Sequence, residues 1–146
     1  MPDYLNTAQI KRIAEQTLPP TYREPYVQAF FGADPSFYLP SLAQMKNFMK
    51  HAMILPPVDI GAGFDCDDYA YALKGSIGIW NRNYTKLQTS WCVGVIFARF
   101  SWMGDVDHAA NWFIDKSGTL WLIEPQTRKE YPATSVASAS IKLILL

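Results

Sequence analysis

The chain carries no net charge and has no long hydrophobic run. Its 146 residues include 13 lysines and arginines against 13 aspartates and glutamates, so the electrostatic footprint of a nucleic-acid binder is missing. No apolar stretch approaches the roughly 20 residues that span a bilayer, and the polar segment 1–16 lacks the apolar core of a signal peptide. We therefore expect a cytoplasmic protein without nucleic-acid or membrane partners. The sequence gives no indication of its oligomeric state.

Cysteine is scarce, with two residues in the chain. Two cysteines do not make a disulfide framework, and in a reducing compartment the chemistry of a thiol matters more than its pairing. Cys92 lies inside an apolar segment and is interpreted as a core residue. Cys66 opens a predicted helix, where backbone N–H groups and partial positive charge favour a thiolate and can hold an oxyanion. A packing role stays open for Cys66, because it shares an apolar helical stripe with Ala70 and Leu73.

Apolar periodicity and proline breaks predict helices in residues 1–55. These helices run from a cap at Asn6 or Thr7 to Leu18, over Glu24–Phe31, and from Ser41 through Met49. A further helix is expected to start at Asp65 or Cys66, after a glycine-bearing loop over 59–64.

Beyond residue 83 the pattern changes from helical to extended, and a β-hairpin is expected around Lys116-Ser117-Gly118. The expected strands cover Trp91–Phe100, Asp107–Asp115, Thr119–Glu124, Arg128–Tyr131 and Ile141–Leu146, with the last two at the edges. The order of elements predicts a single α+β domain over 1–146, in which 59–146 forms a core of a helix packed on a largely antiparallel sheet.

Only two histidines exist, and His108 is the one placed for chemistry, because His51 lies at the polar end of a helix. The hairpin register puts His108 level with Pro125, or with Glu124 if the turn has a bulge. Glu124 is then within reach across the strands, and a carboxylate there would fix the histidine tautomer. Asn111 is a rival orienter, but strand alternation puts it on the opposite face. A structural histidine and an edge-strand charge stay open as alternatives.

Four acidic residues cluster around the start of the predicted helix. Carboxylates offer the hard oxygen ligands that suit calcium, but no EF-hand spacing is present, so an ion there would be accessory. Near a thiolate these acids would raise its pKa unless they point away or a cation neutralises them. The four residues are Asp59, Asp65, Asp67 and Asp68.

Three motifs resemble a known superfamily. GFDCDDYAYAL resembles the nucleophile helix of bacterial transglutaminase-like cysteine proteinases, and DHAANWFID followed by LWLIEPQT resembles their histidine and acid strands. The pattern is also similar to the papain-like protease domain fused to a fungal β-trefoil agglutinin, which is calcium-activated. The resemblance covers roughly 59–131.

This resemblance implies a papain-like (transglutaminase-like) fold and a cysteine hydrolase that cleaves amide bonds of a peptide or protein substrate. Cys66 would be the nucleophile, His108 the base and Glu124 its orienter, without a required cofactor. The glutamine that such enzymes often carry before the cysteine is missing, so the backbone N–H of Cys66 would form the oxyanion hole with Gln126 or Trp112.

The same residues are also compatible with other functions. The same triad could serve a transamidase or a cell-wall amidase. A catalytically inactive papain-like module could instead bind peptide or glycan, because aromatic residues make up 14% of the chain and many lie in its first third. Packing in the core is the preferred explanation of these aromatics, with a groove for a peptide or a sugar as the alternative.

Overall fold

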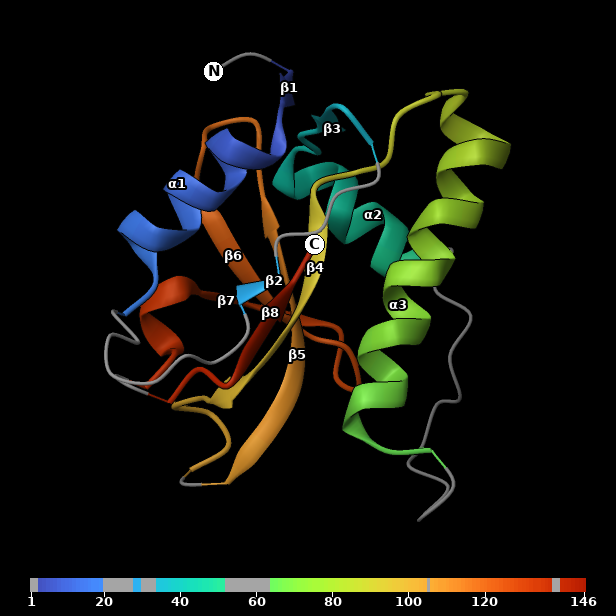
Figure 1. The fold of residues 1–146 in the computed structure, drawn as a ribbon. Helices are drawn as coiled ribbons and strands as arrows, with labels where there is room; N and C mark the ends of the chain where they lie inside the picture. Colours follow the sequence, from blue (N-terminus) through green and yellow to red (C-terminus); the bar gives the residue numbers. More distant parts are fainter. Residues whose placement is uncertain (1–2, 20–27, 30–33, 52–63, 105, 138–139) are drawn as a thin grey trace.

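The computed structural model describes residues 3–19, 28–29, 34–51, 64–104, 106–137 and 140–146. Within these residues a six-stranded sheet has the strand order β2-β8-β4-β5-β6-β7 (Figure 1). Its strands are β2 (Gln28–Ala29), β4 (Val93–Arg99), β5 (Asp107–Ile114), β6 (Leu120–Glu124), β7 (Lys129–Pro132) and β8 (Leu143–Leu145). A second, two-stranded sheet pairs β1 (Tyr4–Leu5) with β3 (Phe37–Tyr38).

The described part of the chain contains three α-helices, and polar caps explain where they begin. They are α1 (Thr7–Thr17), α2 (Leu42–His51) and α3 (Cys66–Trp80); α3 continues into a π-helix, η1 (Asn81–Thr85), and a 3-10 helix, η2 (Ala133–Ser135), follows β7. Asn6 and Asp65 each form a capping box at the start of α1 and α3, which satisfies backbone N–H groups that the helix leaves without partners. Before the second helix, the Ser41 backbone N–H donates to Gln44 Oε1 and the Gln44 backbone N–H donates to Ser41 Oγ. The predicted starts of these helices are confirmed.

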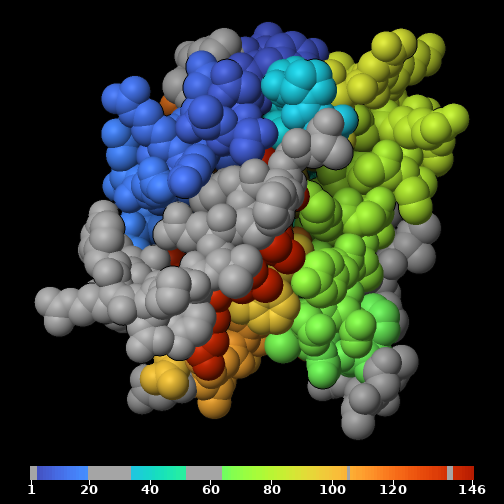
Figure 2. Space-filling model, viewed as in Figure 1, coloured from blue at the N-terminus to red at the C-terminus, as the bar shows by residue number. Residues whose placement is uncertain are grey.

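The helices cover both faces of the sheet. On one face Ile10 and Ala14 of α1 pack in a cluster with alternate residues of the strands, including Ile96 and Trp112. On the other face α2 and α3 pack against the residues in between, such as Phe113. Figure 1 shows α1 and α3 on opposite sides of the strands, and Figure 2 shows the C-terminal segment (red) reaching the surface between them.

The expected papain-like core, with N-terminal helices and a nucleophile helix on an antiparallel sheet, is wrong for this structure. The sheet is the main element of the structure, the helices are short, and the sheet is mixed because β2 and β8 run parallel. The helices lie on both faces of the sheet because residues 93–96 of β4 are all buried. A strand that is apolar on both faces needs cover on both sides, so α1 lies across the sheet from α2 and α3.

Other expectations have mixed outcomes. The hairpin of β5 and β6 is confirmed, but its register is shifted by one residue, with Ile114 opposite Leu120. The C-terminal strand is not at an edge, because β8 lies between β4 and β2. The helix expected over 24–31 is wrong at Gln28–Ala29, which form β2, while its other residues and the loop over 59–63 lie outside the described residues. No helix among the described residues is long and apolar enough to cross a membrane.

Candidate functional site

His108 and Glu124 meet at the end of the sheet where β5 begins and β6 ends. In the observed register Glu124 is opposite Ala110, so the two side chains meet diagonally across the strands, within reach of long side chains. His108 Nε2 lies 2.5 Å from Glu124 Oε2, and both side chains are at least 95% buried. The predicted pairing is therefore confirmed as a contact, although the register that predicted it was wrong.

Glu124 has further donors that fix its carboxylate. The backbone N–H of Gln126 donates to Oε1 at 3.0 Å, and the indole N–H of Trp102 donates to Oε2 at 3.4 Å. Trp102 is stacked between Phe100 and Tyr131, with ring centroids 4.4 and 4.0 Å apart. This packing holds the carboxylate rigidly, and with it the ring of His108.

The histidine keeps one nitrogen available. With Nε2 directed at Glu124, His108 Nδ1 takes part in no hydrogen bond among the described residues. If Nε2 carries the proton that faces the carboxylate, Nδ1 of a neutral ring is an acceptor, and it becomes a donor when the ring is protonated. The ring is therefore an oriented polar group that can take one further partner.

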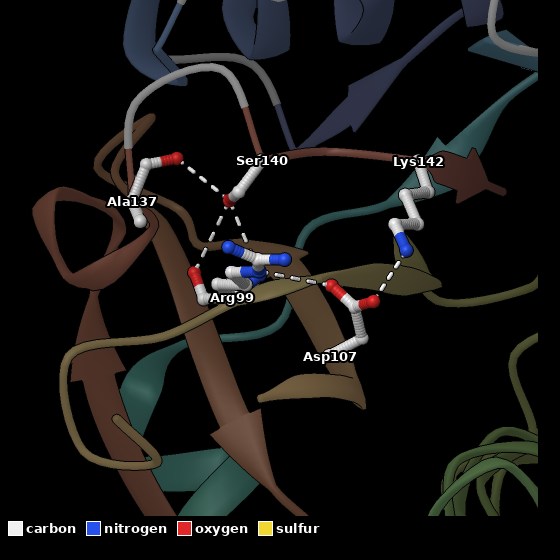
Figure 3. A network of polar contacts seen from close by, with 5 residues as sticks. All are labelled: Arg99, Asp107, Ala137, Ser140 and Lys142. Carbon is white, nitrogen blue, oxygen red and sulfur yellow. Dashed lines mark hydrogen bonds and ion pairs between the residues drawn. The ribbon is translucent and has the colours of Figure 1, made fainter. Parts of the chain in front are cut away.

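Asp107, the residue before His108, forms ion pairs with Arg99 and Lys142. Figure 3 shows its carboxylate between Arg99 and Lys142: Arg99 Nε lies 3.2 Å away and Lys142 Nζ binds the other oxygen. The hydrogen bond from Lys142, helped by Arg99, lowers the pKa of Asp107. The same cluster ties β4 to the approach of β8, because the Arg99 backbone N–H donates to Ser140 Oγ at 3.1 Å. Asp107 therefore anchors the start of β5 rather than assisting His108.

Cys66 packs against residues other than His108 and Glu124. It is the first residue of α3, is partly buried, and packs against Ala70, Val95 and Ala109. Ala109 and His108 are neighbours on β5, so their side chains point to opposite faces. No hydrogen bond joins Cys66 to His108 or Glu124 in the described part of the chain. The structure thus assembles two of the three residues predicted to form a triad.

The two cysteines should differ strongly in reactivity. We expect iodoacetamide at about pH 8 to label Cys66 in the folded protein and to leave Cys92 unlabelled, because only a thiolate reacts. Burial raises the pKa of the Cys92 thiol to about 12 and also blocks access to it. Peptide mass spectrometry would locate the label. Urea should expose both thiols, and equal labelling rates without urea would contradict this expectation.

The supporting residues Asn111 and Trp112 have structural contacts. The Asn111 amide donates to the carbonyls of Ala70 at 2.9 Å and Gly94 at 3.1 Å, which ties α3 to β4. Trp112 Nε1 donates to the Leu145 carbonyl at 3.0 Å, which ties β5 to β8. Asn111 points away from His108, as alternation predicted. Gln126 contacts the pair through its backbone, which donates to Glu124.

The acidic start of α3 is explained largely by helix capping. The Asp65 backbone N–H donates to Asp68 at 3.1 Å, and Asp65 Oδ1 accepts from the backbone of Asp67 at 3.4 Å. A side-chain hydrogen bond with Asp65, together with burial and the charges of Asp65 and Asp68, raises the pKa of Asp67. Ligand atoms of Asp65, Cys66 and Asp67 lie within 4.8 Å of one another. Asp59 lies outside the described residues, so calcium binding stays a prediction.

Removing the cap should weaken the helix that carries Cys66. We expect Asp65→Ala to lower the free energy of unfolding by about 1 kcal/mol, because an N-cap acceptor is lost. Asp67→Ala is the matched control, since the Asp67 carboxylate forms no part of the capping box. This substitution should change the free energy of unfolding by less than about 0.5 kcal/mol. Urea denaturation measures both. Equal effects of the two substitutions would contradict the capping role.

Comparisons with known proteins identify the family. A sequence model of the family described as "Agglutinin C-terminal" matches residues 54–130. The match covers more than half of the chain, and the chain therefore belongs to the agglutinin C-terminal family. A search among curated proteins gives no significant match.

Two solved structures share the fold. One is a complex of PSL1a with E64, with 21% sequence identity and a TM-score of 0.74 over 99% of this chain. The other is the lectin of Polyporus squamosus bound to the human-type influenza-binding epitope Neu5Acα2-6Galβ1-4GlcNAc, with 21% identity and a TM-score of 0.72, again over 99% of this chain. This chain spans about half the length of those proteins, 51% and 50%.

These findings correct the identity drawn from the resemblance. The family that matches is an agglutinin family and the similar structures include those of a lectin, so the predicted assignment to papain-like or transglutaminase-like cysteine peptidases is wrong. The predicted hydrolase, transamidase and amidase activities and the peptide substrate rested on that assignment and are overturned with it. A binding module, the alternative from the sequence, agrees better with an agglutinin.

Proposed function

We propose that this chain is a ligand-binding domain of an agglutinin-type protein, that its ligand is a glycan, and that the ligand contacts His108 at the end of the sheet. The single observation that carries the site is the buried pair of His108 and Glu124, 2.5 Å apart. Taking a titratable pair out of water costs desolvation energy, and direct contact between the two groups offsets part of that cost. The ligand class is supported by membership of the agglutinin family.

The chemistry of the site suits a sugar hydroxyl. A hydroxyl both donates and accepts, so it can bond to His108 Nδ1 in either protonation state of the ring. Glu124 fixes the direction of that bond, because its own oxygens are held by Gln126 and Trp102. An oriented group binds more tightly than a mobile one, since less side-chain entropy is lost on binding.

The proposal can be tested with the two ligands that the similar structures carry. The chain would be titrated in a calorimeter with Neu5Acα2-6Galβ1-4GlcNAc and, separately, with E64. We expect the trisaccharide to bind and Glu124→Gln to weaken binding about tenfold, as one charge-assisted hydrogen bond is lost. Lys11→Gln on α1 is the control, because its ion pair with Glu15 is exposed and lies on another element.

Each outcome has a clear meaning. If the folded chain fails to bind the trisaccharide, the glycan proposal fails, and sugar recognition in the similar lectin belongs to the half that this chain does not match. If only E64 binds and Glu124→Gln weakens E64 binding, the proposal of a ligand site at His108 holds and the proposal of a glycan ligand fails. Binding that is indifferent to Glu124→Gln would move the ligand away from this site. Circular dichroism of each variant separates lost binding from lost folding.

Calcium is proposed as an accessory ligand at the start of α3. Asp65 and Asp67 offer carboxylate oxygens close together, and a bound cation would offset the repulsion between their charges. A ligand that binds only the folded state must raise its melting temperature. We therefore expect calcium to raise the melting temperature of the wild type, and to do so less for Asp67→Asn. An unchanged wild-type melting temperature would remove calcium from the proposal.

A further inference from the structure

A cleft lies toward the other end of α3 from Cys66. After η1 the chain turns back toward the sheet and enters β4 (Figure 1). Between α3, η1 and this returning segment lies this cleft of about 470 Å³, a size typical of small-molecule sites. The cleft shares no residue with the His108–Glu124 pair.

The described charges that line this cleft have one sign. Lys74, Arg82 and Lys86 all line it, and no carboxylate is among the described lining residues. No ion pair engages any of the three cations within the described part of the chain. The described acid beside the cleft is Asp34, which accepts a hydrogen bond from Ser90 Oγ at 2.6 Å. The cleft therefore has a positive field that one nearby acid offsets only in part.

Two residues of the cleft carry hydrogen-bond donors that the described residues leave unused. Lys74 Nζ donates to the Val93 carbonyl at 2.7 Å, and an ammonium group has three donors. Burial lowers the pKa of Lys74, and a bound anion would oppose that effect. Trp91 also lines the cleft, and its buried Nε1 has no partner among the described residues. Buried donors without partners are rare in native proteins.

The backbone that presents these groups is unusual. Trp80 leads into η1, and π-helical turns occur frequently at functional sites. Lys86 follows in the left-handed region, at φ 56°, which is uncommon for a residue with a side chain. The Asn81 side chain fixes the fold of the loop by donating to the Thr89 carbonyl at 2.8 Å. Arg82 and Lys86 therefore project from an ordered turn.

The geometry points to a binding site for an organic anion of about monosaccharide size, with its carboxylate or phosphate group against Lys74, Arg82 and Lys86 and its body against Trp91 and Leu87. Charge-assisted hydrogen bonds to cationic side chains are the strong contacts of such a site. This inference is independent of the proposed function, because it depends on other residues and another surface.

Three sugars of the same ring size test this site: glucuronate, glucose 6-phosphate and neutral glucose. Each is titrated at millimolar concentrations into the full chain labelled with ¹⁵N, and the indole N–H signal of Trp91 reports binding. We expect at least one of the two anions to shift this signal, glucose to leave it unchanged, and added salt to weaken the shift. Whichever anion binds more tightly identifies the source, carboxylate or phosphate.

Variants separate the cleft from general surface charge. We expect Arg82→Gln and Lys86→Gln each to weaken anion binding about tenfold, and Lys11→Gln, which removes one positive charge on α1, to leave it unchanged. Arg82 and Lys86 are used because neither side chain forms a hydrogen bond or an ion pair with another described residue, whereas Lys74 donates to the Val93 carbonyl and helps to hold β4. Equal binding of all three sugars, no shift with any of them, or an equal loss in Lys11→Gln would each overturn the inference.

Discussion

Gly94→Ala is expected to unfold the protein or to lower its free energy of unfolding by at least about 3 kcal/mol. A Cβ atom at this position of β4 would lie inside contact distance of the Leu145 carbonyl and of the Trp112 indole. The indole fills the space that the missing side chain leaves, and its N–H donates to the same carbonyl at 3.0 Å. The added methyl would therefore push apart three strands and break a partly buried hydrogen bond.

Gly75→Ala on α3 is the matched control for this prediction. A Cβ there meets nothing within 4 Å, and alanine in a helix is better than glycine by roughly 0.5–1 kcal/mol. The same chemical change should thus stabilise the protein at one site and destabilise it strongly at the other. Urea denaturation of both variants measures the difference, and a small effect of Gly94→Ala would show that β4 and β8 can separate without loss of the fold.

The second large effect is expected at the buried pair. Glu124→Leu should cost about 3–5 kcal/mol, because it leaves the His108 ring and the Trp102 indole without their acceptor. The double variant His108→Leu with Glu124→Leu should recover much of this loss, since replacing both members of a buried pair with apolar residues is often close to neutral.

A double-mutant cycle distinguishes this coupling from ordinary packing. We expect the two single substitutions to sum to more than the double, with a coupling of at least about 1 kcal/mol for residues in direct contact. Additive effects would mean that the 2.5 Å contact contributes little, and the proposed binding site would lose its rigid histidine. His51→Leu on the exposed end of α2 is the control for replacing a histidine, and should change stability by less than about 0.5 kcal/mol.

Local signals in the sequence located most of the elements. A polar cap before an apolar period marks the starts of α1 and α3, and Asp65 shows both its capping bonds in the structure. Gly118, at φ 84°, takes the left-handed conformation that the predicted hairpin turn needs. The pairing of His108 with Glu124 also follows from local pattern, because a long carboxylate reaches its partner even when the register is displaced by one residue.

The same local signals do not predict how elements distant in the sequence are arranged in space. The apolar run in β4 indicates burial on both faces but does not say which helix covers each face, and the parallel pairing of β2 with β8 joins segments more than 100 residues apart. The contacts of Cys66 likewise depend on where α3 lies against β4 and β5. The resemblance of short motifs predicted a triad and an enzyme class, whereas the structure joins only two of the three residues.

The sequence by itself determined the helix starts, the hairpin, the central strands and the acid that meets His108, because each depends on residues near in the chain or on strand alternation. Only the tertiary structure decided the order of the sheet, the space at Gly94 that Trp112 fills, and the cleft that brings together Lys74, Arg82, Lys86 and Trp91. Those features arise from packing between segments that are distant in the sequence. The sequence shows which surfaces are apolar, but which of them pack together depends on how well their shapes fit.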